Sequence, residues 1–333
     1  MNESGRLDGR SQGAEASASP TPERYSNTAR VACVTGGGTA VELMASAVFA
    51  LGEVARTHGL EIEDTHVSFG GVAFAWAAQS VPPQTRAAIM GSDAVLVAGA
   101  DEPALADVMS ELDLRAQVTR VRFGRNDDVV FVFPLDDSSV EWTIERAFGI
   151  AQTRKLRLAS VGDAAWTEVV DSVAESHEHV RVEHVAPKVA IPLAAFNAGK
   201  FDVVVVARPW AEPITELAAA PAPSRVAAHA LLGEHGPGLF VPSPDGGSAL
   251  AGHGVVNPSS MLLAAAMMLE HGLGATSAGQ TLAGAVSAAL VDGPQTPDLL
   301  QRGAGATTAE FTKSVVAGFQ LTYANAEFWP EVA

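Results

Sequence analysis

The chain has 333 residues, of which 47% are hydrophobic, enough for one large or two modest globular domains with a sizeable core. Its formal net charge of −17, without any large cluster of lysine and arginine, argues against nucleic acid or an anionic membrane surface as a partner. The single cysteine, Cys33, excludes an internal disulfide and a metal site built from cysteines, and its place in an apolar run predicts core packing.

Residues 1–29 are rich in serine, glycine, glutamate and proline, a composition typical of a disordered tail. They lack the apolar stretch of a secretory signal. The longest apolar run, near Met261–Leu269, is too short to span a bilayer. The sequence therefore predicts a soluble, cytoplasmic protein.

Beyond this tail, short apolar runs alternate with stretches of helical periodicity. Strands are expected at residues 31–34, 94–98, 129–133, 156–161, 180–185 and 201–207. Helices are expected at residues 41–57, 141–154, 166–176, 259–271, 277–290 and 308–318. This βαβ rhythm predicts an α/β fold with a mostly parallel sheet covered by helices on both sides.

A further helical pattern begins near Trp210 and carries two carboxylates, Glu212 and Glu216, four residues apart. Side chains at this spacing lie on one face of a helix, where they could share a cation. The segment from Trp210 to Glu216 is therefore the first candidate for a polar site.

Several stretches, in the same order and at similar spacing, resemble the β-decarboxylating dehydrogenases, the family of 3-isopropylmalate and isocitrate dehydrogenases. The segment Val34–Glu42 is similar to the family's L-P-G-D-G-I-G-P-E, and Leu250–Pro258 to its I-A-G-K-G-I-A-N-P. The other stretches that carry the resemblance are residues 93–99, 111–117, 201–205 with 210–216, 264–269 and 297–311.

The resemblance implies a two-domain α/β homodimer whose active site lies between the domains, with metal ligands contributed across the dimer interface. We expect residues 30–128 and 240–333 to form the first domain, and residues 129–239 the second. The family oxidises a 2-hydroxy acid with NAD and then decarboxylates it.

The resemblance places changed residues at the substrate positions. The family's first substrate arginine falls on Met109, and the second falls on Thr119, beside Arg120. A third arginine, the catalytic tyrosine and a dimer-clasping arm belong to a segment that is missing between Phe133 and Trp142. Losing two or three arginines would remove roughly 3–9 kcal/mol of dicarboxylate binding.

We therefore expect a larger and less polar small-molecule substrate than malate. The side chains predicted to bind it are Met109, Thr119, Arg120 and Trp210. Trp210 replaces a phenylalanine of the family and could instead pack in the core.

The proton-transfer and metal positions have changed as well. The family's catalytic lysine falls on Asp163, and its metal-binding aspartates fall on Lys188, Glu212 and Glu216. An ammonium group repels a cation and has no lone pair to offer it, so no catalytic metal is expected. Lys188 could lie between the two glutamates, either as a salt-bridge cluster or, with Asp163, as the catalytic acid-base group.

The cofactor loop of the family is altered, because Ala249 replaces the aspartate that holds the adenosine ribose. We therefore expect no NAD and no other cofactor. The sequence favours tight backbone geometry over a phosphate loop at Gly36–Gly38, and a helix brace at Asn257. His184 is expected to be structural.

Three further histidines lie in glycine-rich or alanine-rich stretches and could each act as a base. They are His229, His235 and His253.

Three functions fit these changes. The first is a repurposed, cofactor-independent enzyme of secondary metabolism, such as antibiotic biosynthesis, that cyclises, isomerises or rearranges a polyketide-like substrate without redox chemistry. The second is a non-catalytic regulatory or partner subunit of a dehydrogenase. The third is an NAD-dependent 2-hydroxy acid dehydrogenase with atypical ligands. The sequence favours the first, as a homodimer.

Overall fold

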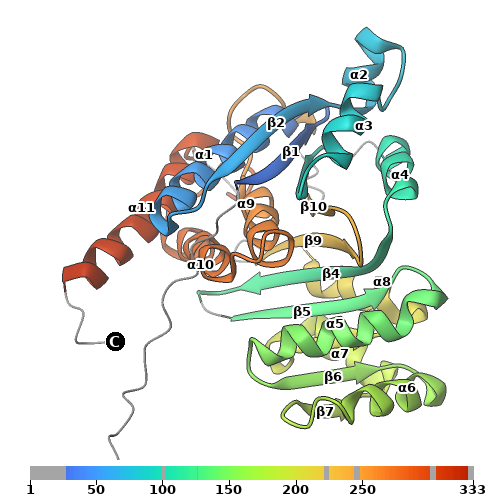
Figure 1. Ribbon diagram of the computed structural model, residues 1–333. Coiled ribbons are helices and arrows are strands. Elements are labelled where there is room, and N and C mark those ends of the chain that lie inside the picture. The colour runs from blue at the N-terminus through green and yellow to red at the C-terminus, as the bar shows by residue number, and fades with distance from the viewer. Residues whose placement is uncertain are drawn as a thin grey trace, which may run out of the picture.

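The computed structural model describes residues 28–99, 102–125, 127–220, 225–243, 248–300 and 305–328. Their ten strands form one sheet in the order β2-β1-β3-β10-β9-β4-β5-β8-β6-β7 (Figure 1). The strands are β1 (Ala29–Thr35), β2 (Ile62–Ser68), β3 (Ala94–Ala98), β4 (Leu114–Phe123), β5 (Asp127–Pro134), β6 (Arg157–Val161), β7 (Arg181–His184), β8 (Val203–Val206), β9 (Arg225–Gly233) and β10 (Gly238–Pro242).

Six of the nine strand pairings within the described residues are parallel, and the antiparallel ones are β4–β5, β4–β9 and β9–β10. The predicted α/β class with a mostly parallel sheet is thereby confirmed. Most of the predicted tail lies outside the described residues, and Ala29, its last predicted residue, already belongs to β1.

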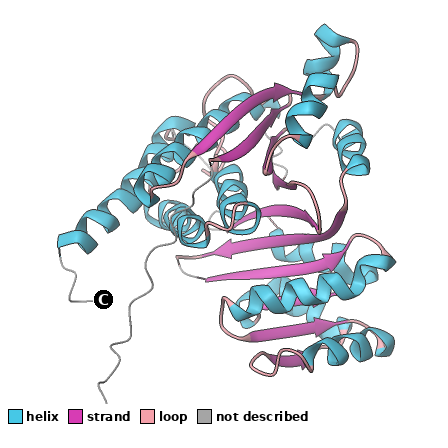
Figure 2. Cartoon of the chain, viewed as in Figure 1, coloured by secondary structure: helices cyan, strands magenta, loops and turns pink. Residues whose placement is uncertain are grey.

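Helices cover both faces of the sheet (Figure 2). They are α1 (Ala40–His58), α2 (Gly70–Ala77), α3 (Pro83–Met90), α4 (Glu102–Glu111), α5 (Val140–Gln152), α6 (Ala164–Ala174), α7 (Pro187–Asn197), α8 (Arg208–Ala219), α9 (Ser259–Met267), α10 (Thr276–Asp292) and α11 (Thr308–Phe328). A π-helical turn, Met268–Gly272, continues α9. Within the described residues, no helix combines the length and apolar character that a membrane crossing requires.

Local sequence explains why these elements begin and end where they do. Every residue of β3 is apolar and buried, as expected for a strand covered on both faces. Helix α1 ends at Gly59, whose left-handed φ of 66° suits a residue without a Cβ and whose N–H bonds to the carbonyl of Ala55. Asp163 caps α6 by accepting a hydrogen bond from the N–H of Trp166 at 3.0 Å.

The turn between β1 and α1 packs closely against the end of β3. A Cβ on Gly36 would come within 2.6 Å of the Gly99 carbonyl oxygen, and a Cβ on Gly99 within 2.6 Å of the Ala40 Cβ. This close approach accounts for the glycines and agrees with the tight-turn interpretation of residues 36–38.

The hydrophobic core differs between the two faces of the sheet. On one face a single cluster runs beneath α1, α9, α10 and α11 and continues beneath α5 and α6. On the other face the core is split into one cluster with side chains from α3 and α4 and another with side chains from α7 and α8. The interruption between these two clusters lies over β4 and β9, and it is where polar side chains gather.

The predicted domain limits remain a prediction. The sheet is continuous through both proposed domains. The limit at 128/129 falls inside β5, and the limit at 239/240 falls inside β10.

Candidate active site

A pocket of about 560 Å³ opens between the sheet and α8, where the core is interrupted. We call it the central pocket. Its lining residues are Gln117, Phe133, Pro134, Leu135, Arg208, Ala211, Glu212, Thr215, Glu216, Ala219, Ala220, His229 and Ser243. The sheet contributes a mostly apolar floor, and α8 contributes the charged side chains.

The polar part of the floor comes from three strands in register. Thr119 on β4 is the direct neighbour of His229 on β9, and Ser243 follows the end of β10. Thr119 Oγ1 lies 3.0 Å from Nδ1 of His229, and Ser243 Oγ lies 3.0 Å from its Nε2. Gln117 Nε2 lies 3.3 Å from the same Nδ1. Both ring nitrogens of His229 are therefore engaged.

Burial lowers the pKa of His229 to about 4, so its imidazole is neutral at physiological pH. The sequence alone predicts His229, His235 and His253 equally as a possible base. The structure singles it out, because His235 is exposed in the loop before β10 and His253 lies in a different pocket. His184, expected to be structural, is exposed and lies 2.9 Å from Asp171.

Helix α8 presents its carboxylates to the central pocket as the spacing predicted. Pro209 lies in its first turn, where a missing N–H costs nothing. Glu212 and Glu216 are exposed, lie one turn apart and both line the pocket. Arg208 from the start of the same helix lies 3.6 Å from Asp137, an exposed pair.

Lys188 does not join these glutamates within the chain. It lies exposed near the start of α7, and none of the ion pairs formed by the described residues connects it to Glu212 or Glu216. Asp163, the other predicted acid-base group, is exposed and engaged as the cap of α6. Neither side chain lines the central pocket.

The four predicted substrate contacts occupy different surroundings. Thr119 is fully buried beneath the pocket, in contact with His229. Met109 is half-buried and packs against the α3–α4 core cluster, and Trp210 is half-buried against the clusters on both faces. Arg120, although adjacent to Thr119, points to the opposite face of the sheet, because successive strand residues alternate.

On that opposite face Arg120 belongs to a buried network of charges. It donates to Asp128 at 2.7 Å and to Glu270 in the π-helical turn at 2.6 Å. Arg154 at the end of α5 donates to both oxygens of Asp128, and to Asp202 at 2.8 Å. The prediction that Arg120 replaces a substrate arginine does not fit this geometry, because its guanidinium is already paired away from the pocket.

This network shifts the pKa of its members. Burial alone would raise the pKa of Asp128, but the guanidiniums of Arg154, Arg120 and Arg122 bring it well below its usual range. Burial and the charge of Arg120 lower the pKa of Arg122 to about 10. Full pairing is what allows these charges to remain ionised in the interior.

A second pocket, of about 490 Å³, lies between α1, α11 and the loop that precedes α9, and we call it the helix pocket. Its polar groups include Glu42, His253 and Lys313, and its apolar wall includes Phe49. Within the described part of the chain, Oε1 of Glu42 is buried and has no hydrogen-bond partner. Glu42 lines this pocket, and a carboxylate oxygen without a partner is a candidate acceptor for a ligand hydroxyl.

Nearby, Asn257 has the bracing role that the sequence predicted. Its amide nitrogen donates to Thr296 at 2.9 Å, and its carbonyl oxygen accepts from the N–H of Ser259 at the start of α9.

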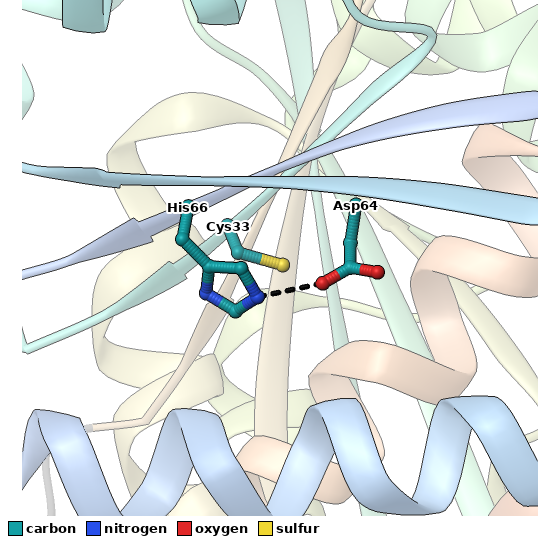
Figure 3. Close-up of side chains that lie close together, drawn as sticks. All are labelled: Cys33, Asp64 and His66. Atoms are coloured by element: carbon teal, nitrogen blue, oxygen red, sulfur yellow. Dashed lines mark hydrogen bonds and ion pairs between the residues drawn. The ribbon is translucent and has the colours of Figure 1, made fainter.

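A third cluster lies at the edge of the sheet, where Cys33 on β1 is in register with His66 on β2 (Figure 3). His66 Nε2 lies 2.6 Å from Asp64, and the potential ligand atoms of all three residues lie within 4.8 Å of one another. Burial and the charge of Asp64 raise the pKa of the Cys33 thiol to about 12, so it is protonated at neutral pH. Burial of Cys33 confirms its predicted packing role.

Fold and pockets together define an α/β protein with a pocket on one face of a long mixed sheet. The chain belongs to the isocitrate/isopropylmalate dehydrogenase family, because the family model of that description matches residues 128–315. The resemblance seen in the sequence is thereby confirmed.

Individual relatives agree with this assignment. The 3-isopropylmalate dehydrogenase of Bacillus cereus is 28% identical over 344 residues, covering 86% of this chain and 96% of that protein. The enzyme of that name from Streptococcus mutans is 24% identical over 343 residues, covering 86% and 99%.

Solved structures share the fold. A β-decarboxylating dehydrogenase from Thermococcus kodakarensis superposes with a TM-score of 0.78 at 21% identity, covering 91% of this chain and 99% of that one. Isocitrate dehydrogenase from Methylococcus capsulatus gives a TM-score of 0.74 at 19% identity, covering 88% and 100%.

These comparisons overturn the predicted function. A cofactor-independent, non-redox cyclase or isomerase of secondary metabolism was the wrong prediction, because the relatives that match along most of the chain are dehydrogenases. Substitutions at single site positions are weaker evidence about the reaction than a scaffold retained along most of the chain.

Two groups that the family implies fit this chain differently. A metal centre of the family's kind does not fit, because the resemblance places Lys188 at the third aspartate position, and its ammonium group repels a cation and offers it no lone pair. A nicotinamide dinucleotide fits better. The orphaned oxygen of Glu42 can accept from a hydroxyl, and Lys313 can face a phosphate.

Proposed function

We propose that this chain is a nicotinamide-dependent dehydrogenase whose substrate carries an oxidisable hydroxyl, or the corresponding ketone, but not the carboxylates of malate. The cofactor, when bound, accepts or supplies the hydride. The observation that carries the proposal is the buried, unpartnered oxygen of Glu42 in the helix pocket. The proposal reverses the expectation that no cofactor binds.

The residues proposed to hold the dinucleotide come from segments that resemble those of the family. Glu42 closes the segment from Val34 to Glu42, and His253 belongs to the segment from Leu250 to Pro258. With Ala249 at the position of the ribose aspartate, the Glu42 carboxylate is the remaining acceptor for a ribose hydroxyl. Lys313 supplies positive charge at the same pocket.

The central pocket supports a substrate with few or no negative charges. Its floor holds a neutral imidazole, and its helical wall presents Glu212 and Glu216. Among the described residues that line the pocket, Arg208 supplies the only guanidinium, and it lies near Asp137. A dicarboxylate would meet two like charges there, whereas hydroxyl or amino groups would find acceptors.

Titration of the purified chain with NADH and NADPH, followed by cofactor fluorescence, tests the proposal. We expect one cofactor to bind, and Glu42→Gln to weaken it about ten-fold, the scale of one charge-assisted hydrogen bond. Glu53→Gln, on the same helix but outside the pocket, is the matched control. Failure of both cofactors to bind at millimolar concentration would overturn the proposal.

A substrate panel completes this test. Isopropylmalate, isocitrate and uncharged secondary alcohols are compared by the appearance of NADH or NADPH absorbance. We expect turnover with an uncharged alcohol to exceed turnover with either acid, and a preference for isopropylmalate or isocitrate would contradict the proposed substrate class.

We also propose that the chain forms a homodimer through the layer of α7 and α8. Two apolar side chains of α7 are unusually exposed, Phe196 at 91% and Val189 at 52%, and Leu217 of α8 is exposed as well. Lys188 lies on the same layer, free to approach a partner's pocket. Light scattering tests this, with a dimer expected for the native chain and a monomer for Phe196→Glu.

A further inference from the structure

The hydrogen-bond partners of His229 determine which ring nitrogen carries the proton. Nδ1 faces Gln117 Nε2 at 3.3 Å and Thr119 Oγ1 at 3.0 Å. An amide nitrogen can only donate, so Nδ1 must accept. The same amide also donates to Thr119 Oγ1 at 3.2 Å. The threonine oxygen accepts in that contact, so its own proton can point to Nδ1. The neutral imidazole therefore carries its proton on Nε2.

This tautomer decides what Ser243 can do. The Nε2–H of His229 donates to Ser243 Oγ at 3.0 Å, so the serine is an acceptor in this contact and is not deprotonated by the histidine. Its own O–H remains available to a group in the central pocket, which Ser243 lines. An activated serine nucleophile would need the opposite tautomer, with Nε2 accepting.

The main chain of Ser243 is fixed from behind. Its N–H donates to Ser260 Oγ at 2.8 Å, and Ser260 in turn donates to the carbonyl of Ala227 on β9 at 2.6 Å. Ser260 lies in the first turn of α9, and Ala227 lies two residues before His229 on the same strand. The donor hydroxyl is thus held by β9 and α9 together, which is the preorganisation that a binding site requires.

We propose that Ser243 donates a hydrogen bond to an uncharged carbonyl or hydroxyl oxygen of the substrate, with His229 as the positioning residue that polarises it. The inference deepens the proposed dehydrogenase function, on which it rests, by assigning a substrate oxygen in the central pocket to Ser243. No covalent bond changes in this contact. A neutral imidazole can strengthen a donor in this way without becoming charged.

The charges around the site agree with an uncharged oxygen. Glu212 and Glu216 line the same pocket, so an incoming carboxylate would be repelled there. The His229–Ser243 pair adds no positive charge, because burial keeps the imidazole neutral. This set of groups binds a carbonyl or hydroxyl more readily than an anion.

The tautomer is measured first, on the full chain and independently of activity. Long-range proton–nitrogen NMR at pH 7 distinguishes a protonated Nε2 from a protonated Nδ1, with the His229→Gln spectrum assigning the signals. We expect Nε2–H. A carboxylate in Gln117→Glu would accept from Nδ1 instead and should reverse the tautomer. Finding Nδ1–H or imidazolium in the native chain would overturn the inference.

Ligand binding is measured next, with cyclohexanone as the uncharged probe and malonate as the anionic one. Cyclohexanone should shift the His229 ring signals, Ser243→Ala should weaken its binding about ten-fold, and Ser243→Thr should preserve it. Ser138→Ala, at an exposed serine outside the pocket, should change nothing. Equal binding to Ser243→Ala, or shifts with malonate alone, would refute the donor role.

The two proposals fail separately. A chain that responds to cyclohexanone but binds neither NADH nor NADPH keeps the donor site and loses the dehydrogenase function. A chain that binds a cofactor while Ser243→Ala behaves as native keeps the function and loses the donor.

Discussion

The two faces of β4 accommodate polar side chains in different ways, by neutral hydrogen bonds on one face and by buried ion pairs on the other. Thr119 points toward the central pocket and meets a neutral histidine. Arg120, the next residue, points to the other face and meets two carboxylates. The part of the pocket floor that β4 forms is uncharged and open to a ligand, whereas the opposite face of β4 is charged and buried.

The difference shows how a family scaffold can change its chemistry while its core persists. The charged network joins β4, β5, the end of α5 and the π-helical turn, so it ties together elements far apart in the sequence. Loss of one member would leave its neighbours buried with fewer counter-charges. The pocket face has fewer interdependent groups, so its residues can vary at lower cost.

The largest expected effect comes from breaking the charged face. Asp128→Asn removes the carboxylate shared by Arg120 and Arg154, and we expect it to lower the free energy of unfolding by about 3–5 kcal/mol. Denaturant titration measures this loss. Asp292→Asn breaks the exposed pair with Arg125 and should cost roughly 0–1 kcal/mol. Similar losses for the two variants would contradict the contrast.

An effect that is smaller per pH unit should come from acid. Burial lowers the pKa of His229 to about 4, and burial with the charges of Arg146, Arg120 and Arg154 lowers that of His271 to about 3. Below the unfolded value of about 6.5, the unfolded chain therefore binds more protons than the folded chain. Stability should fall by up to about 1.4 kcal/mol per pH unit for each histidine.

Urea titrations between pH 7 and 4 measure this slope, and His229→Gln should reduce it by the contribution of one proton. The charged groups that share the pocket with His229 are Glu212, Glu216 and Arg208. The contribution of Asp128 to stability changes only at lower pH. Because its pKa is depressed, its contribution is present above about pH 3.8 and is lost only as the pH falls through its folded value.

A third variant separates a helix cap from a catalytic acid. Asp163→Ala removes the acceptor for the N–H of Trp166 and should cost about 1 kcal/mol of stability without changing turnover. Asp163→Asn, which keeps an acceptor, should retain most of the stability. Loss of turnover at unchanged stability would instead restore the acid-base role that the sequence suggested.

The smallest effect is expected at Lys188. Its side chain is exposed, so Lys188→Ala should change the stability of the subunit by less than about 0.5 kcal/mol. An effect on cofactor-dependent turnover without one on stability would indicate that Lys188 acts in the partner subunit's pocket.

Periodicity was sufficient for the elements with a regular apolar pattern. The strand at residues 94–98 and the helix beginning near residue 41 are found within a residue of the predicted limits. A prediction from continuous apolar runs misses strand β4, because β4 alternates polar with apolar residues and buries guanidiniums. The prediction for Arg120 rests on its adjacency to Thr119, the position of the family's second substrate arginine, but neighbours along a strand point to opposite faces.

Only the part of the site that depends on spacing along one helix could be predicted from the sequence. Four-residue spacing places Glu212 and Glu216 on one wall of the pocket, as found. The contact between His229 and Thr119 joins residues 110 positions apart, and it depends on the antiparallel register of β4 and β9. The register of β4 and β9 is a property of the assembled sheet, and no spacing along the chain predicts it.

The alternation along β4 has a consequence for how the sheet assembles. If β4 paired one residue out of register, Arg120 would face the α7–α8 side without Glu270, and Thr119 would lie among the buried charges. Such a misaligned sheet would leave the buried Glu270 without the guanidinium of Arg120, and Asp128 with Arg154 as its main counter-ion. The charge arrangement therefore favours the native register of β4, since only one alignment of the strand neutralises the buried charges.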